Sequence, residues 1–166
     1  HFVLAPRFAA TESAQKDIAS QAPATKTNED AATAVIRPRD EVLGETKRIT
    51  IDGPEMIGTI PLTGNRFDDI SLKNFYIHLK DSKPITLLSP AESEYPLYTE
   101  SGWLSNDTNI PIPDKNTVWA VKGNSILTPN SPVILTWNNG QGLSFEKQIQ
   151  IDEHFLITVT QSVTNN

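Results

Sequence analysis

The C-terminal part of the chain alternates apolar and polar residues with a period of two, which is typical of β-strands with one buried face. Three strands are predicted, at residues 133–138, 143–151 and 155–163. The cluster Asn138–Gly142 is rich in residues that tolerate positive φ, and polar residues also separate the second strand from the third, so the chain is expected to reverse at both places. The pattern predicts an antiparallel meander that covers a core on one side.

The apolar face of this meander is well defined on its last two strands. Its members there are Leu143, Phe145, Ile149, Ile151, Phe155, Ile157, Val159 and Val163. Polar side chains such as Glu146 and Gln148 alternate with them and are expected to face water.

Shorter alternating segments precede the meander and are separated by Gly, Pro and Asn. We predict strands at residues 47–52, 56–62, 66–76, 85–88, 97–103 and 117–122. Roughly ten short strands with turn-rich spacing, and no convincing helix after residue 45, are typical of an all-β sandwich or barrel.

The N-terminal part has a different composition. Residues 9–45 are rich in Ala, Thr, Ser, Gln and charge, and they lack aromatic side chains. Such a segment buries too little apolar surface to offset its ordering entropy, so we predict a disordered linker. A short helix at residues 11–21 is the alternative, although it would be marginal on its own. The apolar start, residues 1–8, is interpreted as the end of a hydrophobic segment or as tag sequence.

The composition excludes some classes of function. The chain has no Cys, which excludes disulfides and thiolate chemistry. Its net charge of −6 arises from the residues after Arg48, because seven basic and seven acidic residues cancel in residues 1–48. An acidic folded part without a basic stripe argues against nucleic-acid binding. The chain begins without Met, and we expect a fragment or a processed form.

Few residues suggest chemistry. Asp68 and Asp69 form an adjacent carboxylate pair, but neighbours in a strand point to opposite faces, so a turn or an ion pair with Arg66 is favoured over joint catalysis. His78 and His154 have no metal-binding spacing. We therefore predict no catalytic residue, no metal site and no cofactor.

The large aromatic residues are the remaining candidates. Trp103, Trp119, Trp137, Tyr95 and Tyr98 could stack on a sugar, but a sandwich core also uses such side chains, and the core role is favoured. Trp103 and Tyr98 are predicted as possible exposed aromatic contacts.

Three blocks resemble the large periplasmic domain of the YidC membrane-protein insertase family. They are LTWNNGQGLSF at residues 135–145 with TVTQSVTN at 158–165, the stretch 51–73 with its GTIPLTGNRFDDISLK core, and residues 87–103 with LLSP and SGW. The resemblance implies a β-supersandwich similar to galactose mutarotase. It also implies a place between the first two membrane helices of an insertase, in the bacterial inner membrane and facing the periplasm.

The resemblance further implies a function. The whole protein would insert and fold inner-membrane proteins, alone or with the Sec translocon, and this domain would be a non-catalytic interaction module. Its partners would be Sec translocon components and nascent membrane proteins. The alternative is a stand-alone mutarotase-like or carbohydrate-binding β-sandwich.

The resemblance also suggests a division of the chain. Residues 1–45 would be the exit from a membrane helix followed by a flexible linker, and residues 46–166 would be the sandwich, cut short relative to the family domain. We then expect the apolar face of the last strand to stay partly exposed, because later strands of the family domain would cover it.

Overall fold

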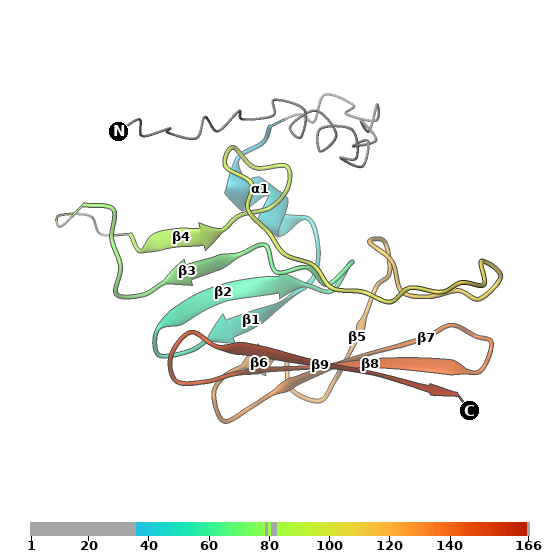
Figure 1. Ribbon diagram of the computed structural model, residues 1–166. Helices are drawn as coiled ribbons and strands as arrows, with labels where there is room; N and C mark the ends of the chain where they lie inside the picture. Colours follow the sequence, from blue (N-terminus) through green and yellow to red (C-terminus); the bar gives the residue numbers. More distant parts are fainter. Residues whose placement is uncertain (1–35, 79, 81–82, 166) are drawn as a thin grey trace, which may run out of the picture. The chain divides into compact units, whose positions relative to one another are not determined.

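The computed structural model describes residues 36–78, 80 and 83–165. β-strands dominate this part of the chain, which contains one short helix among the described residues. The strands form two sheets (Figure 1), and their buried side chains share one hydrophobic core. The predicted all-β sandwich class is therefore confirmed.

The first sheet has five strands in the order β4-β3-β2-β1-β6. They are β1 (Arg48–Asp52), β2 (Met56–Pro61), β3 (Ile70–Leu72), β4 (Ile85–Leu88) and β6 (Ile126–Leu127). All neighbours are antiparallel except β1 and β6, which are parallel. The register shifts between Ile70 and Ser71 where β3 meets β4, so the β4 edge of the sheet is irregular.

The second sheet contains the predicted meander. Its order is β5-β7-β8-β9, with β5 (Ala120–Lys122), β7 (Val133–Asn138), β8 (Leu143–Ile151) and β9 (Ile157–Asn165), all antiparallel. The turn after β7 forms as expected, because the Asn138 side-chain oxygen accepts a 2.7 Å hydrogen bond from the Gly140 amide, where φ is 72°. The meander prediction is confirmed.

The core lies between the two sheets, and both contribute to it by alternation. The fully buried apolar residues are Ile49, Ile51, Ile60, Leu127, Val133, Leu135 and Ile149. In β1, buried positions alternate with exposed ones, as a strand with one wet face requires. On β9, Ile157 and Val159 pack against this core, whereas Val163 is 51% exposed.

A helix, α1 (Arg39–Gly44), lies within the range predicted as a linker. It is held by Arg37, whose guanidinium bonds the carboxylates of Glu45 and Glu92 and whose backbone N–H donates to the Glu92 carbonyl at 2.9 Å. The absence of a structured element up to residue 45 was therefore a wrong expectation. Residues 1–35, including the alternative helix at 11–21, lie outside the described residues.

Three predicted strands are shorter or absent, and of residues 117–122 only β5 is formed. Residues 66–76 contribute only β3, and residues 97–103 make only single bridges, from Leu97 to Ser89 and from Thr99 to Phe67. The physical reason is that residues 97–103, called the crossing segment below, leave the first sheet and reach the second. A chain that passes between sheets cannot pair along its length with either.

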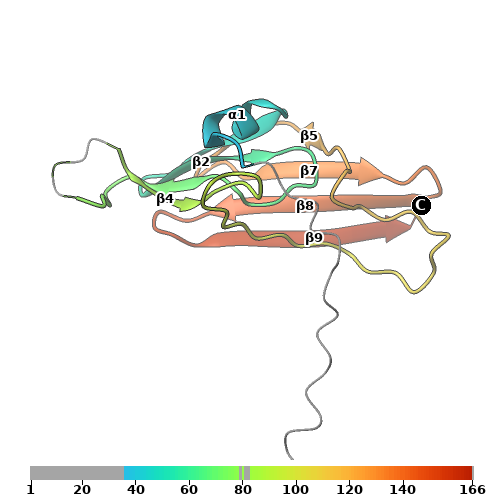
Figure 2. The same ribbon diagram turned by 90° about the horizontal axis from the view of Figure 1, so that it is seen from above.

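Figure 2 shows the same arrangement from above, with α1 on the side of β2 and β5 and the long β8 and β9 side by side. Within the described residues, we find no helix that is long and apolar enough to cross a membrane.

Candidate functional site

An apolar groove with a volume of about 1010 Å³ runs beside the edge strand β4. One wall is formed by residues 83–87, and the opposite wall by residues 94–97. Four large apolar side chains in its lining are exposed, namely Ile77 at 70%, Leu87 at 46%, Tyr95 at 78% and Leu97 at 56%. Exposed apolar side chains thus gather around one groove.

Backbone pairing fixes the second wall of the groove. Ser89 and Leu97 exchange two hydrogen bonds, of 2.8 and 3.1 Å, so the chain returns alongside the end of β4. The turn between them is closed by the buried Ser93 hydroxyl, which donates to the Pro90 carbonyl at 2.7 Å. Since both ends of the turn are bonded, Tyr95 is presented on a fixed backbone.

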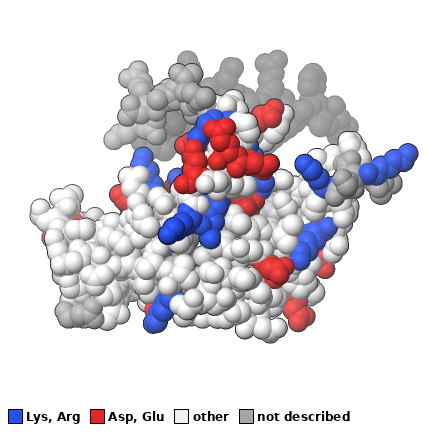
Figure 3. All heavy atoms as spheres, turned by 180° about the vertical axis from the view of Figure 1, so that it is seen from behind, with Lys and Arg blue, Asp and Glu red and all other residues white. Residues whose placement is uncertain are grey.

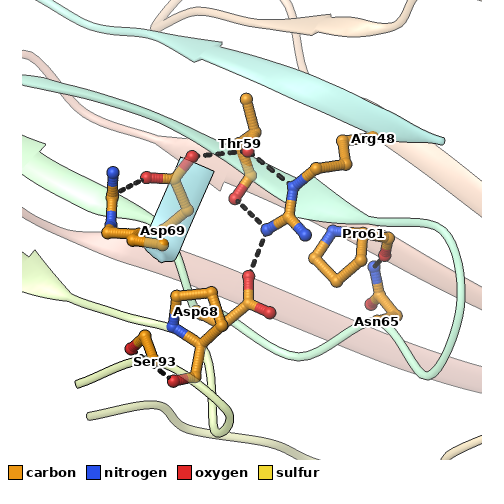
Figure 4. Close-up of polar contacts among 9 residues, drawn as sticks. Arg48, Thr59, Pro61, Asn65, Asp68, Asp69 and Ser93 are labelled. Carbon is orange, nitrogen blue, oxygen red and sulfur yellow. Dashed lines mark hydrogen bonds and ion pairs between the residues drawn. The ribbon is translucent and has the colours of Figure 1, made fainter. Parts of the chain in front are cut away.

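Arg39 of α1 also lines the groove, and it is ion-paired with a polar network that includes Arg48, Asp68 and Asp69 (Figure 4). Its guanidinium bonds the Asp69 carboxylate, which accepts a second hydrogen bond from the Thr59 hydroxyl. The Thr59 hydroxyl in turn accepts from Arg48 Nε at 2.7 Å, and the Arg48 guanidinium bonds Asp68. The network ties α1, β1 and β2 to the segment before β3.

This network corrects one prediction. Asp68 and Asp69 are both buried and both form ion pairs, but their partners are Arg48 and Arg39 rather than Arg66. Burial raises the pKa of Asp68, and the Arg48 guanidinium acts against that rise. The two carboxylates bind different cations, so the pair acts as a structural junction in this fold.

A glycine permits the network to form. A Cβ on Gly58 would lie 2.0 Å from the backbone oxygen of Asp69. Only a residue without a side chain lets β2 approach the Asp68–Asp69 backbone this closely.

The two predicted contact residues lie in different surroundings. Tyr98 is 42% exposed, and the Arg66 guanidinium sits 5.0 Å from the centre of its ring. Trp103 is half-buried, stacks on Trp119 with ring centres 5.6 Å apart, and meets the Phe145 ring edge-on at 5.2 Å. Tyr98 is thus exposed but does not line the groove, whereas Trp103 packs mainly against the core.

Lys147 was not predicted to lie on the apolar face of β8, but the structure places it there. It is 1% exposed, and its ammonium donates to the Ser101 carbonyl at 2.9 Å. The same ammonium lies 5.5 Å from the Trp103 ring centre and 5.4 Å from that of Trp119. Burial lowers the pKa of Lys147, while Glu100 acts in the opposite direction. The period-two pattern, which puts position 147 between Phe145 and Ile149, was the signal that could have revealed it.

One face of the molecule carries a cluster of charged side chains. Figure 3 shows these acidic and basic side chains in the upper part of the view, with further charged side chains scattered over the surface below. The ion pairs of α1 and its neighbours contribute Arg37, Glu41, Glu45 and Glu92. The predicted absence of a metal site stays a prediction; the described residues contain no group of three or more His, Asp or Glu side chains that could hold a metal ion.

The fold and the groove define a class, the all-β sandwich domains that present an apolar surface beside a sheet edge. A family model described as the YidC periplasmic domain matches residues 48–166, and the chain belongs to that family. The predicted resemblance is therefore confirmed, and it begins at the first residue of β1.

Relatives agree with this family. The chain is 44% identical over 128 residues to a membrane protein insertase YidC from Pelagibacter ubique, covering 77% of this chain and 23% of the relative. It is 37% identical over 159 residues to the membrane protein insertase YidC of Maricaulis maris, covering 95% of this chain and 26% of the relative. A third, from Jannaschia sp., is 40% identical and covers 89% of this chain and 24% of the relative. The chain thus spans about a quarter of the length of these relatives.

Proposed function

We propose that this chain is the periplasm-facing interaction module of a membrane protein insertase, and that its groove binds apolar segments of client membrane proteins. The groove beside β4 is the observation that carries the proposal. Contiguous exposed apolar surface is uncommon on soluble domains and marks binding sites. The relatives, which are named membrane protein insertases, supply the class of client.

The shape and charge of the groove favour an extended apolar segment. Its volume of about 1010 Å³ lies at the upper end of ligand-binding pockets. Arg39, Lys83 and Glu94 are the charged residues in its lining, so neither sign of charge dominates. Because β4 is an edge strand, a bound segment could also pair with its free backbone groups.

The remaining features of the proposal follow the family. We infer that the module is non-catalytic and belongs to a protein of the bacterial inner membrane, which acts alone or beside the Sec translocon. Residues 1–45 would connect the sandwich to a preceding membrane helix. The alternative of a stand-alone mutarotase-like or carbohydrate-binding sandwich is not favoured, because the match covers residues 48–166 of the chain.

A peptide-binding assay tests the proposal. A fluorescent apolar peptide with terminal lysines is titrated with the chain, and binding is followed by anisotropy. Replacing Tyr95 and Leu97 together by Ser should weaken binding by about tenfold or more, since each buried apolar side chain contributes about 1.5–3 kcal/mol.

The matched control is Leu104→Ser, which changes a fully exposed leucine that does not line the groove. Its affinity should equal that of the unsubstituted chain. Equal binding by all three chains, or no binding by any of them, would contradict the proposal.

A further inference from the structure

Within the described residues, Lys147 is a buried cation without a carboxylate partner among its hydrogen bonds and ion pairs. In β8 it stands opposite Leu135 of β7 and Gln161 of β9, in the middle of the second sheet. A lysine is almost never fully buried unless it is paired. An apolar residue at this position would continue the face formed by Phe145 and Ile149, so packing alone does not explain a lysine here.

The Lys147 ammonium contacts the crossing segment at Ser101 and Trp103. Its ammonium bonds the Ser101 carbonyl, and it lies over the rings of Trp103 and Trp119. Gln161 of β9 adds a 3.4 Å hydrogen bond from its side-chain amide to the Ser101 hydroxyl. The second sheet therefore holds this irregular segment through side chains, where no strand pairing is available.

The other end of the crossing segment is held by backbone bonds to the first sheet. Leu97 pairs with Ser89, and Thr99 exchanges hydrogen bonds of 2.8 and 3.0 Å with Phe67. The segment is thus anchored at one end by backbone ladders and at the other by the Lys147 side chain. Leu97 and Tyr98 belong to the backbone anchor, whereas Ser101 and Trp103 belong to the end that the Lys147 side chain holds.

We propose that Lys147 is a positioning residue, whose ammonium ties residues 101–103, the far end of the crossing segment that starts at the groove residue Leu97, to the second sheet. The consequence for client binding rests on the proposed function of the groove. The tie itself does not, and it can be measured without any client.

Hydrogen exchange in the 166-residue chain tests the tie. Lys147→Met keeps a long apolar side chain but removes the ammonium, so exchange of the Thr99 amide, which donates to the Phe67 carbonyl at 3.0 Å, should become about tenfold faster while exchange in β1 stays the same. Lys147→Arg retains a cation with several donors, and it should restore slow exchange of the Thr99 amide. The matched control is Lys122→Met, which removes an exposed lysine from β5 in the same sheet and should change neither region.

Exchange of the Thr99 amide that is equally slow in Lys147→Met would overturn the proposal, whatever the peptide assay shows. If Lys147→Met does not fold, nuclear magnetic resonance of the unsubstituted chain decides the question. The Lys147 ammonium protons should then exchange slowly and show contacts to the Trp103 and Trp119 ring protons. An ammonium that exchanges as fast as that of Lys122 would overturn the proposal.

Discussion

Two buried charged clusters hold this sandwich together, and they are built in opposite ways. In the first sheet, Arg48 and Asp68 form a direct ion pair, and Thr59 connects them to a second carboxylate. In the second sheet, Lys147 meets a carbonyl oxygen and two indole rings. The first cluster neutralises its charge, whereas the second retains it.

The difference indicates what each cluster contributes. A satisfied ion pair is costly to break but links elements that the sheet already aligns. The lowered pKa of Lys147 shows that burial disfavours its charge more than its surroundings favour it. A charge kept at a net cost in stability is better explained by what it positions, which here is the crossing segment beside the groove.

The largest expected effect comes from breaking the first cluster. Asp68→Asn keeps the shape of the side chain but leaves the Arg48 guanidinium buried without its counter-charge, so the free energy of unfolding should fall by about 3 kcal/mol. Urea unfolding followed by fluorescence measures this change.

The control for that variant is Glu146→Gln, which breaks the exposed pair between Lys122 and Glu146, 3.5 Å apart. An exposed pair contributes about 0–1 kcal/mol, so this loss should be much smaller. Equal losses in the two variants would show that the buried network contributes no more to stability than an exposed ion pair does.

A change of pH is expected to have a smaller effect on the free energy of unfolding, and this effect reports on Lys147. Its pKa is lowered in the folded chain from the ordinary value of 10.5, so the unfolded chain binds more protons between the two values. The free energy of unfolding should therefore rise with pH across that window and stay flat below it.

The comparison is made with Lys147→Met over a series of pH values up to 10.5, because the other titrating groups are common to both chains. The charged and aromatic groups that act on the Lys147 ammonium are Glu100, Trp103 and Trp119. A difference between the two chains that does not change with pH would mean that Lys147 keeps its ordinary pKa.

The sequence predicted well the parts of the fold that depend on local pattern. The meander followed from alternation and from the turn at Asn138 and Gly140, both of which are local signals. The helix α1 could not be predicted from local signals, because long-range ion pairs stabilise it. Arg39 pairs with Asp69, 30 positions away, and Arg37 pairs with Glu92, 55 positions away. Those partners cannot be chosen from neighbouring residues.

The candidate site was harder to predict for the same reason. Tyr98 was identified by residue type alone, but the groove depends on the pairing of Leu97 with Ser89, which only the folded chain reveals. Lys147 was predictable in position, because alternation places it on the apolar face. Its partners were not, since Ser101 lies 46 residues away in an irregular segment.

The central claim is that the groove beside β4 contacts client membrane proteins, and crosslinking tests it most directly. A photo-reactive amino acid is placed at position 97 in the full-length insertase, and a membrane protein is synthesised in the presence of membranes that contain it. The account predicts a crosslink between position 97 and the client during insertion, and none from position 104, which is more exposed than position 97 but lies outside the groove. Crosslinks of equal yield from both positions, or none from position 97, would contradict it.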